Sequence, residues 1–272
     1  MRTTDFSRAP VQARAEAMVV VEHPEGGRSW QGAARSAARS SSGHRWSTGY
    51  RLRGGARGVL AWFATTADAD AFLAGRPADG ARHRRLRAEA DGYTNGVWRA
   101  EGDVMAHIER FTPVSRELAR GTVPPLVADA AGERRAAVRR RRPSGSSRSA
   151  GSPGSPGSPG SPVDARAMFV GATRYRGPHS WLVLSREWYP MVAAMRRLPG
   201  YVWHGVYWEP PFTLGTLAFF ATRDDLLVFA RVPAHRRLMR WITRDRRHGT
   251  GGYIRLHVAD DEPDGGPGRA AA

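Results

Sequence analysis

The sequence contains no cysteine and no lysine. Without cysteine the chain forms no disulfide bond and no thiolate metal site, and without lysine all 42 basic residues are arginine. The N-terminal residues lack an apolar core of signal-peptide length, and no run approaches the roughly 18 apolar residues of a membrane span. From these absences we expect a cytoplasmic protein.

The composition is strongly basic, with a formal net charge of +17 at pH 7. Arginine-rich surfaces attract phosphate, which favours nucleic-acid binding. However, Ile and Asn are rare while Ala, Gly, Pro and Arg abound, as in proteins from GC-rich bacterial genomes. Residues 129–166 alone hold eight arginines against three acids, which supplies +5 of the total. We therefore expect no nucleic-acid partner, and we keep a non-catalytic ligand- or nucleic-acid-binding protein as an alternative.

A stretch rich in Ser, Gly and Pro, from Arg139 to Ala165, divides the chain. Its repeated Gly-Ser-Pro unit offers no apolar surface to bury and resists both helix and strand, which predicts a disordered tether. The boundaries that we predict are a first repeat over residues 14–118, a disordered linker over 119–167, a second repeat over 168–261 and a disordered tail over 262–272.

Similar phrases stand on the two sides of this tether. Gly58–Thr65 reads GVLAWFAT, and Gly215–Thr222 reads GTLAFFAT. The phrase HRRL at His83–Leu86 recurs at His235–Leu238. Because matches in the same order are hard to obtain by chance, they indicate an internal duplication.

A third block extends the alignment of the two halves. It places GDVMAHIERF, from Gly102, on GYIRLHVADD, from Gly252, and pairs His107 with His257. We expect these two histidines to occupy the last strand of each repeat.

Each half shows the same predicted order of elements. In the second half we predict strands at MFVGATRYR (from Met168), Tyr201–Trp208, Thr216–Thr222 and GYIRLHVAD (from Gly252). We predict one helix over Ser185–Leu198, behind a Ser N-cap, and a second helix that is capped by Thr222 and interrupted near Pro233. In the first half the strands are AMVVVEH, HRWSTGYRL, VLAWFAT and DVMAHIERF, and the first helix is SWQGAARSAARSS. The order βαββαβ is that of the ferredoxin-like unit.

The strands Tyr201–Trp208 and Thr216–Thr222 are apolar on both faces. A four-stranded sheet with helices on one side needs polar residues on the other side, unless that side is covered too. We therefore predict an α+β fold in which two ferredoxin-like sheets pack face to face around an apolar cavity. They would form an α+β barrel, either as a pseudo-dimer within one chain or as a homodimer.

The chain resembles the dimeric α+β-barrel superfamily, and within it the antibiotic-biosynthesis monooxygenase group. The residues that carry the resemblance are Pro199-Gly200-Tyr201, Phe219-Phe220, Thr222–Asp225 and Pro233–His235. The resemblance implies a small-molecule monooxygenase-like tailoring enzyme of bacterial secondary metabolism. Such an enzyme oxidises an aromatic or polyketide-type substrate without a metal or flavin cofactor.

This chemistry needs an apolar pocket, a base with a pKa near neutrality and a cation that holds the substrate anion. The candidates are Trp203, Tyr207, Trp208, Phe220 and Met195 for the pocket, His204, His235 or His257 for the base, and Arg174 or Arg255 for the cation. We select as catalytic residues His204, His257 and Arg255, and we add Arg174 to the substrate-binding residues.

Each candidate also has a structural interpretation. An aromatic stripe is typical of a core as well as of a ligand pocket. His83 and His235 recur in both halves, which is typical of structural residues. His204 has no counterpart in the first half, where Thr48 falls near its place, so it is the first residue to test.

A second branch of the same superfamily binds haem. Single chains with two ferredoxin-like halves resemble chlorite dismutases, dye-decolourising peroxidases and aldoxime dehydratases, which use a His as the iron ligand. This branch implies haem as the alternative cofactor, held by His235 or His257. Haem-degrading members carry an Asn on the first strand, and neither AMVVVEH nor MFVGATRYR contains one, so we do not expect haem degradation.

Overall fold

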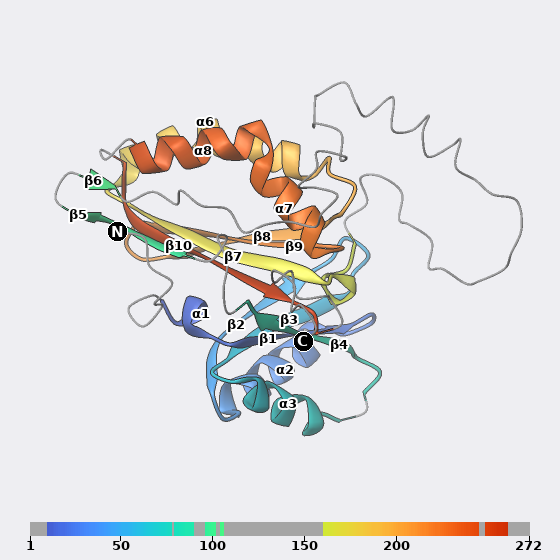
Figure 1. Cartoon of the computed structure of the whole chain (residues 1–272). Helices are drawn as coiled ribbons and strands as arrows, with labels where there is room; N and C mark the ends of the chain where they lie inside the picture. Colours follow the sequence, from blue (N-terminus) through green and yellow to red (C-terminus); the bar gives the residue numbers. More distant parts are fainter. Residues whose placement is uncertain are drawn as a thin grey trace, which may run out of the picture.

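The computed structural model describes residues 10–77, 79–89, 96–101, 104–105, 160–244 and 248–260. These residues form an α+β fold in which antiparallel strands lie between two layers of helices (Figure 1). The predicted α+β class and the antiparallel, barrel-like sheet are confirmed. Of the third aligned block of the first half, the structure describes only Val104–Met105, and His107 lies outside the described residues.

The helices and strands divide into a first and a second half. The first half contains α1 (Val11–Arg14), β1 (Ala17–His23), α2 (Arg28–Ser40), β2 (His44–Arg51), β3 (Arg57–Phe63), α3 (Thr66–Ala74), β4 (Arg82–Ala88), β5 (Gly96–Glu101) and β6 (Val104–Met105). The second half contains the 3-10 turn η1 (Pro162–Asp164), β7 (Ala167–Tyr175), α6 (Pro178–Met195), β8 (Tyr201–Glu209), β9 (Thr213–Phe220), α7 (Arg223–Arg231), α8 (Pro233–Arg244) and β10 (Gly249–Val258).

Eight strands form one path, in the order β2-β3-β1-β4-β10-β7-β9-β8. The path crosses from one half to the other where β4 meets β10, at the pairs His257–Ala88 and Val258–Arg87. Figure 1 shows four layers: α6, α7 and α8, then the sheet of β7–β10, then the sheet of β1–β4, and then α2 and α3. We call the two sheets the upper and the lower sheet, and the space between them the inner layer.

The strand order is the same in the two sheets: β2-β3-β1-β4 in the lower and β8-β9-β7-β10 in the upper. The two similar sequence phrases fall on β3 and β9. Gly58 pairs with Tyr50 on the neighbouring strand, and Gly215 pairs with Tyr207. A side chain at either glycine would overlap the ring of its tyrosine partner, which explains why glycine stands at both positions.

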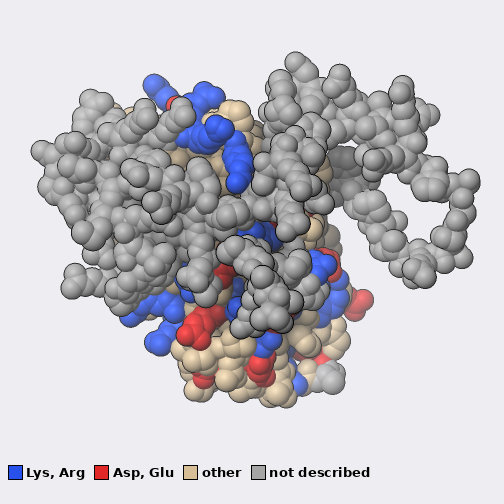
Figure 2. Space-filling model, viewed as in Figure 1, with Lys and Arg blue, Asp and Glu red and all other residues tan. Residues whose placement is uncertain are grey.

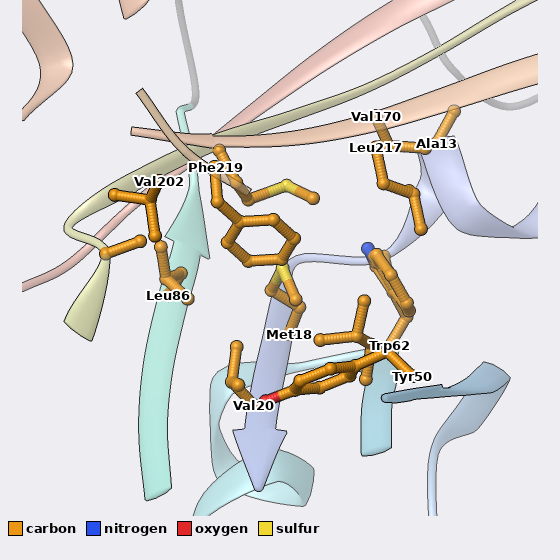
Figure 3. Packing of buried hydrophobic residues seen from close by; sticks show 14 of the residues in the cluster. Ala13, Met18, Val20, Tyr50, Trp62, Leu86, Val170, Val202, Leu217 and Phe219 are labelled. Carbon is orange, nitrogen blue, oxygen red and sulfur yellow. The ribbon is translucent and has the colours of Figure 1, made fainter. Parts of the chain in front are cut away.

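Apolar side chains fill the inner layer and both spaces between helices and sheets. On β9, Leu217 and Phe219 face the inner layer, whereas Ala218 and Phe220 face the helices. Figure 3 shows residues of the inner-layer cluster from both sheets, among them Met18, Val20, Trp62, Leu86, Val170 and Phe219. Both faces of β9 are therefore covered, as its sequence indicates, whereas β8 is covered on its inner side and exposes Val206 and Trp208 on the other.

Two aromatic contacts join the sheets across the inner layer. The rings of Trp46 and Tyr207 lie 5.2 Å apart, and those of Tyr50 and Trp203 lie 5.3 Å apart, measured between centroids. Trp46 pairs with Trp62 on β3 as Trp203 pairs with Phe219 on β9, so the two tryptophans are equivalent, and so are the two tyrosines. The same contact thus occurs twice in reciprocal form, as across a two-fold axis.

The last strand of the first half differs from our prediction. The strand beside β1 is β4, Arg82–Ala88, and not DVMAHIERF. The phrase HRRL therefore lies on a strand at His83 but in helix α8 at His235, and the two copies are not equivalent. The Arg-rich stretch forms a strand because Leu86 and Ala88 fill the inner side while its arginines reach solvent or acidic partners.

The first helix of the second half begins earlier than predicted. Helix α6 begins at Pro178, whose fixed φ suits the first helical position, and Ser185 lies inside the helix. The Thr222 cap is confirmed, because its hydroxyl accepts a hydrogen bond of 3.1 Å from the backbone N–H of Asp225. Thr65 and Asp68 form the same cap in the first half, at 3.1 Å.

The end of the expected linker belongs to the folded part of the chain. Pro162 and Val163 are buried in η1, and β7 begins at Ala167. Residues 119–159 of the expected linker and the expected tail, residues 262–272, lie outside the described residues.

Charged side chains of both signs share the visible surface. In Figure 2, arginines gather over the α6–α8 layer, and blue and red side chains are mixed on the lower part of the molecule. Arg85, for example, contacts both Asp70 and Asp260. Among the described helices, none has the length and the apolar character needed to cross a membrane.

Candidate functional site

The residues expected to form one site lie in different layers. Side chains alternate along a strand, so the residues of β8 and β10 divide between two faces. Trp203 and Tyr207 pack in the inner-layer cluster, and Arg255 and His257 share the face of Tyr253, which belongs to that cluster too. These four expected residues therefore lie in the inner layer.

Four of the other expected residues lie on the helix side of the upper sheet. His204 and Trp208 lie on the helix-facing side of β8. Phe220 and Met195 are 0 % exposed in the cluster beneath the helices, so they support the sheet and are not open to a substrate. Arg174 is exposed at the end of β7, and the alternation that puts Val170 and Ala172 in the inner-layer cluster places it on that same side of the strand.

A tyrosine–histidine pair stands at the start of β8. The hydroxyl of Tyr201 lies 2.6 Å from Nδ1 of His204. Residues three apart on a regular strand face opposite sides, but the register shifts between Tyr201 and Trp203, and this bulge brings both rings to the helix-facing side. When Nδ1–H donates to the tyrosine oxygen, Nε2 of His204 keeps a lone pair that can accept a proton.

The surroundings of the pair keep the histidine neutral. Burial lowers the pKa of His204 from 6.5, and the positive charge of Arg196 lowers it further. Burial raises the pKa of Tyr201, and Arg196 opposes this shift. At neutral pH the pair is thus an uncharged imidazole held by an uncharged phenol, next to a cation.

An exposed apolar row continues from this pair along the same face of β8. Val206 is 45 % exposed and Trp208 is 60 % exposed. Both side chains follow His204 at every second residue, so the three lie in line on one side of the strand. An apolar row that begins at a neutral, oriented histidine is a suitable surface for a small apolar molecule with one acidic group.

The equivalent face of the first half is differently arranged. The strand register places Ser47 and Gly49 of β2 at the positions of His204 and Val206. Helix α2 lies on β2, where Gln31 Nε2 donates to the carbonyls of Tyr50 and Gly58, each at 2.7 Å. A Cβ at Gly49 would lie 2.8 Å from that amide nitrogen, so Gln31 takes the space of a side chain there.

In the upper sheet, α6 packs mainly on α8 and β7, and Val206 and Trp208 of β8 are exposed. The counterparts of Val206 and Trp208 in the first half are Gly49 and Arg51, which are exposed too but not apolar, so the exposed apolar row belongs to the second half. The alignment of the two halves of the sequence placed Thr48 near the position of His204. The structural counterpart is Ser47, one residue earlier.

In the inner layer, two tyrosines join β8 to β10. The hydroxyl oxygens of Tyr207 and Tyr253 lie 2.5 Å apart. Burial is the largest cause that raises the pKa of each phenol, so both stay protonated at neutral pH. Tyr253 was not among the expected site residues, although the alternation of GYIRLHV places it on the face of His257.

His257 is 0 % exposed, where β10 meets β4. Burial, and then the charge of Arg255, lower its pKa from 6.5 to about 3. An imidazole with such a pKa accepts protons poorly at neutral pH. Of the two expected histidines, His204 is therefore the better general base.

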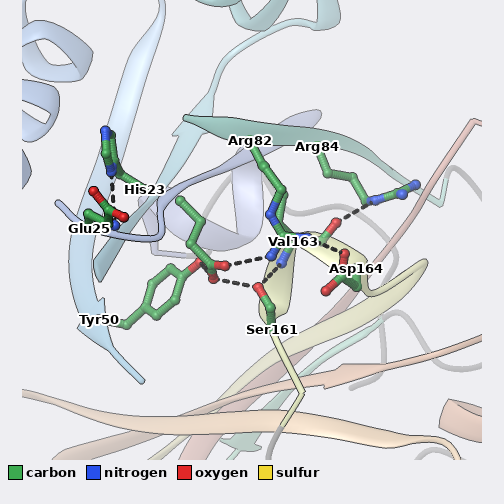
Figure 4. A network of polar contacts seen from close by, with 9 residues as sticks. His23, Glu25, Tyr50, Arg82, Arg84, Ser161, Val163 and Asp164 are labelled. Carbon is green, nitrogen blue, oxygen red and sulfur yellow. Dashed lines mark hydrogen bonds and ion pairs between the residues drawn. The ribbon is translucent and has the colours of Figure 1, made fainter. Parts of the chain in front are cut away.

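A buried carboxylate links the two halves (Figure 4). Glu22 is 2 % exposed and accepts hydrogen bonds from the hydroxyl of Tyr50 at 2.8 Å, from Arg82 at 2.8 Å and from Ser161. Arg82 also contacts Asp164 of η1 at 2.9 Å. The residues before β7 are thus fixed onto the lower sheet.

The residues before β1 make the reciprocal contact, because Gln12 of α1 donates to Glu209 of β8. Sequence reasoning missed this arrangement. The signal that could have revealed it is a repeated phrase, Pro10-Val-Gln-Ala-Arg and Pro162-Val-Asp-Ala-Arg, which precedes the first strand of each half.

His235 lies in helix α8, where it is partly buried. Its Nδ1 lies 3.0 Å from the carbonyl of Ala230, and its ring packs against Phe229 with centroids 4.8 Å apart. Burial lowers its pKa to about 4. Its partner in the sequence alignment, His83, is exposed on β4. In the described ranges no three His, Asp or Glu side chains gather into a metal site.

Comparisons with known proteins identify no family. No protein-family model and no curated protein sequence matches the chain. Among solved structures, a candidate monooxygenase from Lactobacillus acidophilus is similar with a TM-score of 0.33 and 9% identity, over 90% of this chain and 94% of that one. An anthrone oxidase-like protein gives 0.31 and 11%, over 96% and 98%.

An aldoxime dehydratase in complex with butyraldoxime gives a TM-score of 0.44 and 12% identity, over 92% of this chain and 84% of that one. Because all these TM-scores are below 0.5, the function has to be argued from the residues of this chain.

Proposed function

We propose that the chain is a small-molecule monooxygenase-like enzyme that works on the helix-facing side of β8. The observation that carries this proposal is the Tyr201–His204 pair, which stands at the head of the exposed row of Val206 and Trp208. The matching strand order supports the further proposal that the two halves are ferredoxin-like repeats of a duplicated unit.

The substrate class follows from the surface. An aromatic or polyketide-type molecule would place its ring on Val206 and Trp208 and its acidic C–H or O–H group at His204. Nε2 of His204 accepts the proton while Tyr201 holds Nδ1–H, and the charge of Arg196 favours the anion that forms. Arg196 thereby takes the role that we had expected of Arg174 or Arg255.

The oxidation needs no further reductant. The substrate anion adds to O2 at carbon, the proton held by His204 passes to the resulting peroxide, and loss of water leaves one oxygen atom in the product as a carbonyl group. The substrate itself thus supplies the electrons for this step. A role in bacterial secondary metabolism and a cytoplasmic location belong to the same proposal.

Oxygen uptake by the purified chain tests the proposal directly. We would present a panel of anthrones, phenols and cyclic 1,3-diketones and compare wild type with His204→Gln and with His83→Gln, which changes an exposed histidine on β4. We expect uptake with wild type and His83→Gln, and a loss of at least about a hundredfold with His204→Gln. A His204→Gln variant as active as wild type would reject this site.

A haem enzyme of the same superfamily is the second candidate, and His235 favours it. The carbonyl of Ala230 fixes one ring nitrogen, and the ring is neutral at pH 7, which suits an iron ligand whose other nitrogen binds the metal. Haem, when bound, would supply the redox chemistry of the site. His235 would hold the iron, and Phe229 would keep the imidazole in place.

An absorption spectrum separates the two candidates. Haem gives a Soret band on purification or on titration with hemin, and we expect His235→Ala to remove that band if His235 is the ligand. A chain without haem that still takes up oxygen supports the first candidate. The remaining alternative, a nucleic-acid binder, would lose affinity steeply with salt and show no turnover.

A further inference from the structure

Helix α6 carries large apolar side chains on two opposite sides. Leu184, Met191 and Met195 are buried against the core of the second half. On the other side of the helix, Leu182 is 68 % exposed and Tyr189 is 66 % exposed. A helix that is apolar on both sides is usually covered on both, so the outer side of α6 calls for a partner.

The exposed residues of α6 form a stripe along the helix. Leu182, Arg186, Tyr189 and Ala193 follow one another at intervals of four, three and four residues, so they lie in line on one side. All four are exposed, and so is Trp181, which borders this line. We call these five residues the α6 stripe.

The α6 stripe belongs to the outside of the molecule. Figure 1 shows α6 and α8 as the outermost layer on the upper side, above the sheet of β7–β10. The described residues of the first half expose no large apolar side chain, and helix α2, which holds the place of α6 in the order of elements, buries Trp30 in part. The shared fold therefore does not require an exposed apolar helix face, and an exposed apolar group is typical of a binding surface.

The helices on this side are strongly basic. Residues 178–198 and 223–244, which contain α6, α7 and α8, hold nine arginines against three acidic residues. Helices α2 and α3 of the first half hold three arginines against two acidic residues. Figure 2 shows the arginines gathered over the α6–α8 layer. An anionic partner would thus meet a complementary charge on this side.

Several of these arginines flank the apolar residues. Arg186 lies within the α6 stripe, and the exposed Arg196 and Arg197 follow the end of α6. From α8, the exposed Arg237 reaches Glu187 of α6, with Nε 4.0 Å from a carboxylate oxygen. One partner can therefore contact the apolar residues and the arginines together.

This combination of side chains fits the surface of a membrane. Trp and Tyr rings lie at the level of the lipid headgroups, Leu enters the acyl region, and Arg extends its charged end to the phosphates. The excess of positive charge favours anionic lipids. A second copy of the chain would bring two positive faces together, which is unfavourable. A nucleic acid would contact the arginines and leave the apolar side chains without a partner.

We propose that the α6 stripe binds the surface of a membrane that contains anionic lipids. The 18 residues of α6 lie flat on the bilayer. Trp181, Leu182 and Tyr189 enter the boundary between headgroups and acyl chains, while arginines of α6 and α8 contact the phosphates. The α6 stripe contains neither Tyr201 nor His204, so this proposal does not depend on the oxygenase proposal, and either one can fail alone.

Sedimentation of the full chain with lipid vesicles tests the proposal. Vesicles of phosphatidylcholine with about one third phosphatidylglycerol supply the anionic surface, and vesicles of phosphatidylcholine alone are the comparison. We expect the chain to bind the anionic vesicles at least about tenfold more tightly, with an affinity that falls as salt screens the arginines.

Variants of exposed residues locate the contact. Leu182→Ser combined with Tyr189→Ser removes apolar area and should weaken binding to the anionic vesicles by about tenfold or more. Arg186→Glu should weaken it roughly tenfold, because the charge changes sign at the lipid surface. Arg39→Glu makes the same change of charge on α2, on the opposite side of the molecule, and as the control should change the affinity less than about twofold. Unfolding temperatures, which substitutions at exposed positions leave nearly unchanged, check that the variants fold.

Tryptophan emission gives an independent measurement. Acyl chains that carry bromine quench a tryptophan that enters the bilayer, and Trp181 is the tryptophan of the α6 stripe. We expect anionic vesicles with brominated acyl chains to quench the emission of the wild-type chain. Trp181→Phe should remove most of this quenching while it keeps most of the binding, and quenching that stays the same would place the contact elsewhere.

Other results would overturn the proposal as well. Equal binding to both kinds of vesicle, or no binding, would exclude an anionic membrane. Binding that the double variant of Leu182 and Tyr189 leaves unchanged would come from other arginines, such as the run Arg139–Arg142. A dimer in solution that the same double variant dissociates would assign the α6 stripe to a second copy of the chain. His204→Gln should bind vesicles like wild type, so loss of oxygen uptake in that variant bears on the other site alone.

Discussion

Gly49 of β2 and Val206 of β8 occupy equivalent positions, yet Gln31 fills the side-chain space at Gly49 while Val206 is 45 % exposed. A side chain of helix α2 thus lies at this position in the first half, whereas in the second half the position carries an exposed apolar side chain.

The first prediction concerns this difference. Gly49→Val should lower the free energy of unfolding by about 1–3 kcal/mol, because the new side chain and Gln31 cannot share the space. Val206→Gly should cost only about 0.5–1 kcal/mol, the ordinary cost of glycine in a strand. Urea unfolding of the two variants measures both values, and equal losses would mean that the two faces are covered alike.

The second prediction concerns Tyr201 as a positioning residue. Tyr201→Phe keeps the ring and removes the hydroxyl that contacts His204, so kcat should fall roughly five- to tenfold with little change in KM. The rate should depend on neutral His204, which places the acid limb of the pH profile below 6.5. Tyr189→Phe, on the exposed side of α6, is the control. A change in KM alone would assign Tyr201 to substrate binding.

The third prediction concerns Trp208 as the surface for the substrate ring. Trp208→Ala should raise KM by about tenfold or more while kcat stays near the wild-type value, because the ring contributes to binding of substrate and transition state alike. Trp181→Ala removes a similarly exposed tryptophan from α6 and should leave both constants unchanged. Equal effects of the two variants would mean that Trp208 has no special role.

The fourth prediction concerns the stability of the protein in acid. The pKa of His257 is about 3 in the folded chain against 6.5 for a free histidine, so the unfolded chain binds the extra proton first as the pH falls. The stability that depends on neutral His257 is complete above about pH 6.5 and is lost down to about pH 3. Within this window the loss is about 1.4 kcal/mol per pH unit.

Urea unfolding at pH 7, 6, 5 and 4 measures this slope, and His257→Leu should show a shallower dependence than wild type by about that amount. Parallel curves for the two proteins would show that His257 is already protonated or already solvated in the folded state.

The sequence predicted the parts of the fold that depend on local signals. The phrases around Gly58 and Gly215 mark equivalent strands because both need a glycine beneath a tyrosine ring. The caps at Thr65 and Thr222 follow from the spacing of a Thr and an Asp. The strand at Arg82–Ala88 was missed because its arginines hide the inward alternation of Leu86 and Ala88.

The site was harder to predict for a geometric reason. Alternation along β8 separates Trp203 from His204, although they are neighbours in the sequence, and so divides the expected pocket between two layers. The bulge that brings Tyr201 beside His204 leaves no mark in the sequence. The exposure of Val206 and Trp208 depends on where helix α6 packs, and the sequence of β8 alone does not indicate that position.

The segments before β1 and β7 each cross to the opposite half, where Gln12 meets Glu209 and Ser161 meets Glu22. A chain shortened to the second half would remove Gln12 from Glu209, and one shortened to the first half would remove Ser161 from Glu22, which keeps Tyr50 and Arg82 as donors. Because the segment before each first strand contacts the opposite half, each half stabilises the fold of the other. Proteolytic cleavage of the chain between the two halves should therefore leave the two fragments associated.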